Sequence, residues 1–157
     1  MKKSAAYTPA MISLVIPVYN EEGNLTRLME RIRPVMTAMA RPYEVVFVDD
    51  GSRDGSLTIL EGFAQSPDVR VVELTRNYGQ HAAILAGFSI VRGDIVVTLD
   101  ADLQNPPEEI PRLIATMEEG GFDVVGSIRR GRKDSYLRII PSKIINMVAR
   151  KITGVRM

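Results

Sequence analysis

The sequence has no cysteine and a single histidine, His81, among its 157 residues. Disulfide bonds and thiolate metal sites are therefore excluded, which is compatible with the cytoplasm but neutral about the compartment. The apolar runs, such as Ile12 to Val18, fall far short of the roughly 20 residues that span a bilayer. The start, MKKSAAYTPAM, has two lysines but no apolar segment, so it is not typical of a signal peptide. We therefore expect the chain as given to be soluble.

Several common catalytic and nucleotide-binding motifs are also missing. The chain contains neither G-x-G-x-x-G nor G-x-x-x-x-G-K-[ST], so dinucleotide and P-loop sites lose their main support. It has no G-x-S-x-G elbow, and its one histidine disfavours a hydrolase triad. We expect His81 to be a buried or capping residue.

The length and composition indicate one soluble globular domain, with 45% hydrophobic and 25% charged residues. The net charge of +1 hides an asymmetry along the chain. From Arg129 onward nine basic residues face one acid, whereas the first 128 residues hold eleven basic and eighteen acidic residues. This pattern suggests an anionic partner for the basic end, although charge alone slightly favours a solvated basic helix.

Short apolar runs alternate with segments of helical periodicity along the chain. Helices are expected at 25–39, where Pro34 should kink or divide the helix, and at 57–64, 82–91 and 106–119. Asn105 is a suitable N-cap for the last helix, with Glu108 completing a capping-box-like pair, and Gly120-Gly121 should end it. Strands are expected at 12–18, 43–48, 69–74, from Ile95 to the residue before Asp100, and at 123–126. This order predicts an α/β fold: a mostly parallel sheet with helices on both faces.

Two aspartates, Asp100 and Asp102, follow the apolar run that begins at Ile95. Alternate residues of an extended chain point the same way, so both carboxylates should face one point with Ala101 turned away. Two like charges this close repel each other unless a cation lies between them, and hard oxygen ligands favour Mg²⁺ or Mn²⁺. The alternative is that both aspartates only end the strand and solvate a turn.

Four polar clusters should meet at one edge of the sheet, because the carboxyl ends of parallel strands lie together. With the arginines beyond the expected fifth strand, such a carboxylate-rich edge suits a nucleoside diphosphate compound held through a divalent ion. The clusters are 19–22, 49–54, 76–81 and 100–104.

Three motifs in order, PVYNEE (17–22), VDDGSRDGS (48–56) and LDADLQ (99–104), resemble those of family 2 glycosyltransferases. The resemblance is strongest to the group that transfers sugars to polyprenyl phosphates, and two further stretches, 76–89 and 100–113, are most similar to members using 4-deoxy-4-formamido-L-arabinose. It implies a GT-A (Rossmann-like) fold. Residues 1–157 would then be the N-terminal part of the catalytic domain, ending before the acceptor-site and transmembrane segments.

The resemblance also implies roles for residues at matching positions. Those that would line the nucleotide pocket are Pro17, Tyr19, Glu21, Val48, Asp50 and Ala101. The ion would be held by Asp100, Asp102 and Gln104, while Asp102 and Arg129 would act in catalysis, with Arg129 reaching the phosphates. Taken without the resemblance, Pro17, Tyr19 and Asp50 could simply shape turns, and Arg129 could be surface charge.

The activity that the resemblance implies is metal-dependent, inverting transfer of a sugar from a UDP-sugar to undecaprenyl phosphate in lipid A modification. The full-length protein would work at the cytoplasmic face of the inner membrane and would not bind nucleic acid. Its basic C-terminal segment could lie on an anionic bilayer, although the isoleucines there could instead pack against the sheet. Transfer of mannose or glucose, a non-catalytic nucleotide-sugar module and a nucleotidyltransferase are the alternatives. The last normally has a glycine-rich loop with lysine, which 14–24 lacks.

Overall fold

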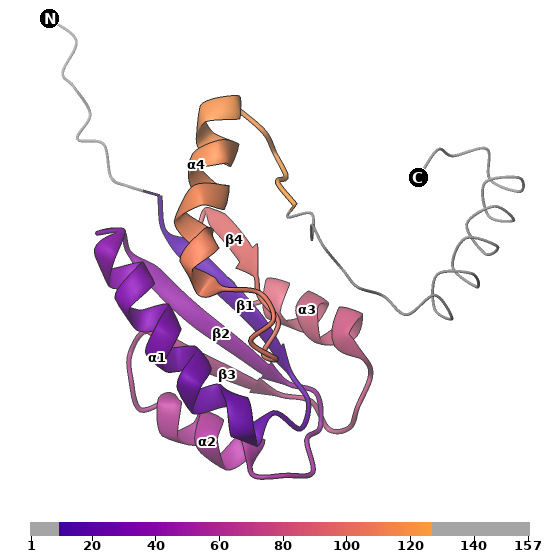
Figure 1. The fold of residues 1–157 in the computed structure, drawn as a ribbon. Helices are drawn as coiled ribbons and strands as arrows, with labels where there is room; N and C mark the ends of the chain where they lie inside the picture. Colours follow the sequence, from indigo (N-terminus) through magenta and orange to yellow (C-terminus); the bar gives the residue numbers. More distant parts are fainter. Residues whose placement is uncertain (1–9, 127–157) are drawn as a thin grey trace, which may run out of the picture. The chain divides into compact units, whose positions relative to one another are not determined.

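The computed structural model describes residues 10–126 of the chain. The chain divides into two compact units, 1–125 and 126–157, and the described residues belong almost entirely to the first. Within 10–126, no helix combines the length and the apolar character needed to cross a membrane. The elements in order are β1 (Ile12–Val18), α1 (Glu22–Ala38), β2 (Tyr43–Asp49), α2 (Ser56–Phe63), β3 (Val69–Glu73), α3 (Gln80–Phe88), β4 (Ile95–Thr98), the 3₁₀ turn η1 (Pro107–Glu109) and α4 (Ile110–Gly120) (Figure 1).

The strands form a four-stranded sheet in the order β3-β2-β1-β4. All three pairings are parallel, with Ile12 opposite both Tyr43 and Ile95, and Val45 opposite Val69. The predicted parallel sheet is therefore confirmed. Because every strand runs the same way, the loops that leave their carboxyl ends come out at one edge of the sheet.

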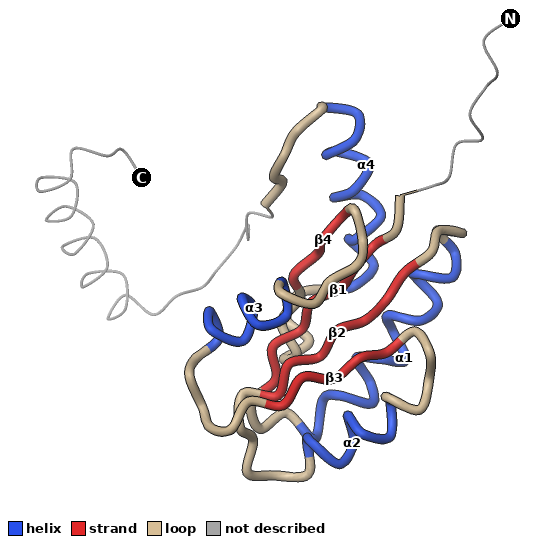
Figure 2. Tube along the Cα trace, turned by 180° about the vertical axis from the view of Figure 1, so that it is seen from behind, coloured by secondary structure: helices blue, strands red, loops and turns tan. Residues whose placement is uncertain are grey.

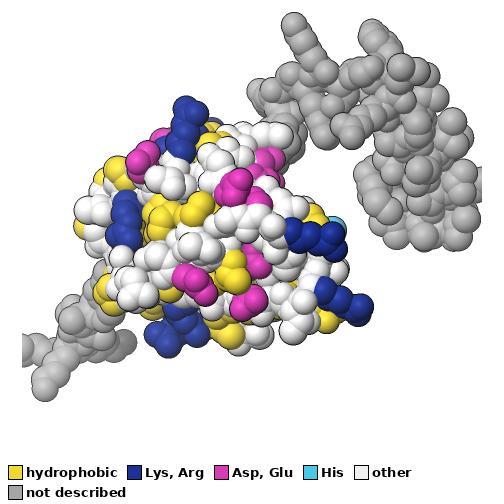
Figure 3. Space-filling model, turned by 90° about the horizontal axis from the view of Figure 1, so that it is seen from below, with side chains coloured by type: hydrophobic (Ala, Val, Ile, Leu, Met, Phe, Trp, Pro, Cys, Tyr) yellow, Lys and Arg dark blue, Asp and Glu magenta, His cyan; other side chains and the backbone are white. Residues whose placement is uncertain are grey.

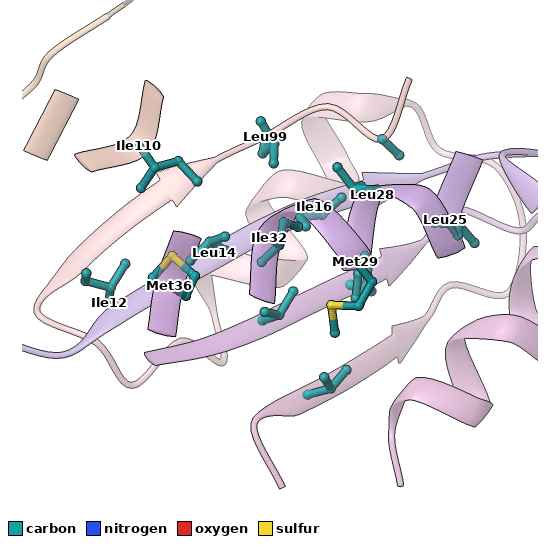
Figure 4. Packing of buried hydrophobic residues seen from close by; sticks show 14 of the residues in the cluster. Ile12, Leu14, Ile16, Leu25, Leu28, Met29, Ile32, Met36, Leu99 and Ile110 are labelled. Atoms are coloured by element: carbon teal, nitrogen blue, oxygen red, sulfur yellow. The ribbon is translucent and has the colours of Figure 1, made fainter. Parts of the chain in front are cut away.

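Helices cover both faces of the sheet, as predicted. The larger core lies between the sheet and helices α1, α2 and α4, which cover one of its faces (Figure 1). Figure 4 shows Ile12, Leu14 and Ile16 of β1 among the residues packed there. Helix α3 lies on the opposite face (Figure 2), over a smaller cluster of Val15, Val46, Val48 and Ala83. The residues of β1 therefore alternate between the two cores, as the two-residue period of a strand requires.

Helix α1 begins three residues earlier than predicted and continues past Pro34 as one helix. Of the two predicted effects of Pro34, a kink or a division, the division was wrong. Pro34 is exposed, as is Glu30, whose carbonyl would have accepted the missing N–H. This carbonyl lies on the solvent side, where water can satisfy it.

The last predicted strand was wrong, and β4 was only partly right. Residues 123–126 pair with no strand of the described sheet. They follow the end of α4, where Gly121 takes a left-handed conformation and Phe122 N–H donates back to the carbonyl of Met117. Strand β4 ends at Thr98 and forms the edge of the described sheet. Its residues alternate between buried and exposed instead of being buried throughout.

The start of the last helix also differs from the prediction. Neither η1 nor α4 has a side-chain cap, and Pro106 occupies the N-cap position of η1. Prolines lie in the first turns of both helices, so fewer N–H groups there need a cap. Glu108 makes an ion pair of 2.7 Å with Arg31 of α1 instead of a capping box. The predicted stop at Gly120-Gly121 is confirmed.

Candidate functional site

The four loops at the carboxyl edge of the sheet meet around one hollow of about 300 Å³. Figure 3 looks onto this side of the molecule, where acidic side chains flank an apolar patch and basic side chains lie nearer the margin. The predicted meeting of four polar clusters is therefore confirmed. The hollow is lined by Pro17, Tyr19, Glu21, Asp50, Asn77, Gly79, Gln80, Asp100, Ala101 and Asp102.

The loop after β1 is held by the loop after β2. The backbone of Asn20 is left-handed (φ 56°), and its side-chain Oδ1 accepts the N–H of Arg53 at 2.8 Å. The N–H of Glu21 donates to Ser56 Oγ at 2.9 Å. These bonds fix the turn that carries Tyr19 and Glu21 to the hollow.

Asp49 and Asp50, adjacent residues at the end of β2, line two different hollows. Asp50 is only 2% exposed, and its two oxygens accept the N–H groups of Tyr78 (2.7 Å) and Gly79 (2.9 Å). Asp50 thus anchors the loop after β3. A contact of Asp50 with a bound base would have to use the lone pairs that these bonds leave over.

Asp49 lines a second hollow of about 300 Å³, together with Glu73 and Arg76. Its Oδ2 accepts the N–H of Ser52, while its buried Oδ1 has no hydrogen-bond partner among residues 10–126. The two-residue period of the strand explains why Asp49 and Asp50 separate in this way.

Asp54, in the same loop, braces it against the start of α1. Its carboxylate accepts the N–H groups of Ser56 and Glu22. Burial by itself would raise the pKa of the Asp54 carboxyl, but the hydrogen bonds from the Ser56 side chain and from the backbone N–H groups of Ser56 and Glu22 outweigh it and hold the pKa below its ordinary value.

Asp100 and Asp102 both line the first hollow, although they lie in a turn after β4 and not in extended strand. The two oxygens of Asp100 accept amide N–H groups from Gln80 Nε2 (2.7 Å) and Asn105 Nδ2 (2.9 Å). Asp102 Oδ1 accepts the N–H of Gln104 at 3.0 Å. Asn105 therefore binds Asp100, and its predicted role as N-cap was wrong.

These carboxylates fit a divalent cation whose remaining coordination positions would be filled by a bound substrate. Within residues 10–126 no group of three or more His, Cys, Asp or Glu side chains forms a metal site by itself. Mg²⁺ in nucleotide sites is usually held by one or two carboxylates plus the phosphates of the substrate. Asp100 and Asp102 both line the hollow, which matches that arrangement.

Val48 and Gln104, which were predicted to be site residues, and His81 do not line the hollow. Val48 has no exposed surface and packs in the core below α3, because it faces inward from β2. Gln104 is exposed and outside the lining, after the left-handed turn at Leu103 (φ 61°). His81 is exposed in α3 and Gly79 is the N-cap, so His81 is neither buried nor capping. Ala101 is buried but does line the hollow, so it is not turned away.

Arg129 and the basic segment after it lie outside the described residues. Asn77, Gly79 and Gln80 also line the hollow, and no individual role was predicted for any of them. The signal that could have found them is their place directly after the third strand, at the same edge as the aspartates.

The sequence model of glycosyl transferase family 2 matches residues 13–155. A curated relative from Shewanella sediminis, named undecaprenyl-phosphate 4-deoxy-4-formamido-L-arabinose transferase, is 57% identical over 93% of this chain and 44% of its own length. A relative of the same name from Serratia proteamaculans is 54% identical over 91% of this chain and 44% of its own length. The chain thus spans less than half the length of these relatives.

Two solved structures have a similar fold. The mannosyltransferase PcManGT from Pyrobaculum calidifontis, solved in complex with GDP-Man and Mn²⁺, is 25% identical, with a TM-score of 0.62 over 79% of this chain and 37% of that one. TarS of S. aureus in complex with UDP-GlcNAc has a TM-score of 0.58 at 23% identity, over 79% of this chain and 38% of that one.

Proposed function

The chain belongs to glycosyl transferase family 2, and we propose that it forms the donor-binding part of an enzyme that transfers 4-deoxy-4-formamido-L-arabinose from a UDP-sugar to undecaprenyl phosphate. The sugar and acceptor follow the names of its relatives. The observation that carries the proposal is the hollow at the carboxyl edge, where all four loops meet beside two carboxylates.

The α/β fold is that of the GT-A glycosyltransferases, as predicted. In such sheets ligands bind outside the carboxyl ends of the strands, where the hollow lies. We infer that Pro17, Tyr19 and Glu21 lie beside the base and ribose. Asp50 supports this pocket mainly by holding the loop at Tyr78 and Gly79.

Asp100 and Asp102 would hold the Mg²⁺ or Mn²⁺ ion. When bound, this ion would supply positive charge to the diphosphate of the donor. Gln104, which the family resemblance placed among the ion's ligands, could join them only if its side chain turned toward the hollow. Arg129 remains a proposed contact of the phosphates.

The reaction requires no general base. An oxygen of the acceptor's phosphate attacks the anomeric carbon of the sugar, the new carbon–oxygen bond forms, and the bond to UDP breaks with its electron pair leaving on the diphosphate. A phosphate monoester is already anionic near neutral pH, because its second pKa is about 6. A single displacement of this kind inverts the anomeric configuration. The protein's part is to position the donor and stabilise the departing charge.

A polyprenyl phosphate acceptor is supplied by a membrane. We propose that the segment from Arg129 onward, with nine basic residues and one acid, meets an anionic bilayer at the cytoplasmic face of the inner membrane. Each cation near such a surface adds about 1 kcal/mol. Flotation of the chain with liposomes containing anionic lipid, but not with neutral ones, is the expected result; equal flotation with both contradicts this assignment.

Calorimetric titration of the chain with UDP in Mn²⁺ tests the donor site. Asp102→Asn removes one of the two proposed ionic ligands and should weaken UDP binding in Mn²⁺ at least tenfold while leaving the melting temperature unchanged. Asp123→Asn is the matched control, because Asp123 is exposed and does not line the hollow. Unchanged UDP affinity in Asp102→Asn would contradict the proposal.

Two competing functions are separated by further assays. PcManGT was solved with GDP-Man, which favours mannose transfer as the second candidate. Tighter binding of GDP than of UDP would support it. A non-catalytic module would bind UDP-sugar but transfer nothing to added undecaprenyl phosphate, even within the full-length protein.

A further inference from the structure

Asp100 is held from two sides by neutral amide groups. Gln80, the first residue of α3, donates its Nε2–H to Oδ1 at 2.7 Å. Asn105, in the loop before η1, donates its Nδ2–H to Oδ2 at 2.9 Å. The two donors come from segments 25 residues apart in the sequence, and both reach the same carboxylate.

The chemical nature of these donors matters for a cation site. A carboxylate has about four lone-pair positions, so two amide hydrogen bonds fix its orientation without using all of them. A lysine or arginine in the same place would fix Asp100 equally well, but its positive charge would repel an incoming metal ion. The amide groups of Gln80 and Asn105 orient the carboxylate without placing positive charge of their own beside it.

The position of Gln80 is itself fixed by other residues of the site. The preceding residue, Gly79, donates its N–H to the buried carboxylate of Asp50. Within α3, Ala83 is fully buried against the sheet. Gly87 lies so close to β1 that a Cβ added to it would be 2.4 Å from Val15 Cγ1. Helix α3 is therefore held by the loop at its start and by the sheet along its length. This gives a connected path from Asp50 through Gly79 and Gln80 to Asp100.

We propose that Gln80 and Asn105 are positioning residues that hold Asp100 in the orientation required to bind the divalent cation. The proposal rests on the proposed function, because it assigns these residues to the cation of that same site. Residues that orient a metal ligand through a hydrogen bond typically change metal affinity by 10- to 100-fold when they are replaced.

The test replaces each amide with an apolar side chain of similar size. Gln80→Met and Asn105→Leu should each weaken Mn²⁺ binding to the UDP-loaded chain by 10- to 100-fold, measured by electron paramagnetic resonance of free Mn²⁺. UDP affinity measured calorimetrically in EDTA should not change. Gln65→Met is the matched control, since Gln65 is exposed and its side-chain amide donates to the Glu61 carbonyl, away from the hollow.

Because Gln80 also lines the hollow, a double-mutant cycle distinguishes positioning from direct contact with the nucleotide. If Gln80 acts through Asp100, the double variant Gln80→Met, Asp100→Asn should bind Mn²⁺ no more weakly than Asp100→Asn alone. Additive losses, an equal loss of UDP affinity in EDTA, or unchanged Mn²⁺ affinity in Gln80→Met would each overturn the proposal. Failure of the unmodified chain to bind UDP and Mn²⁺ together would overturn the proposed function as well.

Discussion

The two ends of the same sheet use carboxylates in opposite ways. At the amino end, Glu44 of β2 is only 3% exposed, and Ser13 Oγ and the N–H of Arg92 both donate to its Oε1 at 2.7 Å. Its Oε2 accepts Arg70 Nη1 at 3.4 Å. At the carboxyl end, Asp100 and Asp102 border an open hollow.

The difference separates a structural carboxylate from carboxylates that line a hollow. Glu44 joins β1, β2, β3 and the segment before β4, and it is closed off from solvent. A charge buried in this way is tolerated only when it is paired and hydrogen-bonded. Changes at the amino end should therefore affect stability alone, and changes at Asp100 or Asp102 should affect binding alone.

The largest expected effect on stability is that of Glu44→Ala. This change leaves the Ser13 hydroxyl and the Arg92 N–H without the carboxylate acceptor, and leaves Arg70 with only its bond to the Ile90 carbonyl. The loss should cost about 3 kcal/mol. Calorimetric unfolding should show the loss, while UDP affinity at a temperature where the variant is folded stays the same. If Glu44→Ala weakened UDP binding but left the free energy of unfolding unchanged, the distinction between the amino and carboxyl ends of the sheet would be wrong.

Asp50→Asn should have a smaller effect on stability and also an effect on binding. Asp50 lies at the carboxyl end but is buried and bonded like Glu44. An asparagine places its NH₂ against the N–H of Tyr78 or Gly79, and the lost bond should cost about 2 kcal/mol. Unfolding and UDP titration should both shift. A change in stability alone would make Asp50 a structural carboxylate like Glu44, and a change in UDP affinity alone would group it with Asp100 and Asp102.

The smallest expected effect is a pH dependence of stability that Glu44 contributes. Burial acts to raise the pKa of the Glu44 carboxyl, but the hydrogen bonds from Ser13, Arg92 and Arg70 prevail and lower it below its ordinary value of 4.5. A carboxyl with a lowered folded-state pKa adds stability above its unfolded pKa and loses it as the pH falls through the folded pKa. Unfolding measured from pH 6 downward should therefore show less acid dependence in Glu44→Gln than in the unmodified chain. Identical slopes would contradict this role.

The parts of the fold that depend on local pattern could be predicted from the sequence. The strands at 12–18, 43–48 and 69–74 were placed within one residue of their observed ends, because apolar runs bounded by polar turns carry a clear signal. The meeting of four loops at one edge followed from parallel strands, which also brought Pro17, Tyr19, Glu21, Asp50, Asp100, Ala101 and Asp102 to one hollow.

The features that the sequence could not predict depend on distant partners. Asn105 has the composition of a helix cap, and only the folded chain shows that it reaches Asp100. Asp50 resembles a turn residue until Tyr78 and Gly79 are seen beside it. The roles predicted for Val48 and Gln104 came from motif position, which carries no information about which way a side chain faces.

The most direct test of the central claim is a crystal structure of the chain with UDP and Mn²⁺, analysed by anomalous scattering at the manganese edge. We predict one strong anomalous peak in the first hollow, between the carboxylates of Asp100 and Asp102 and the diphosphate of UDP. A peak elsewhere, or UDP bound in the hollow with no manganese beside these carboxylates, would contradict the claim that they are the cation ligands.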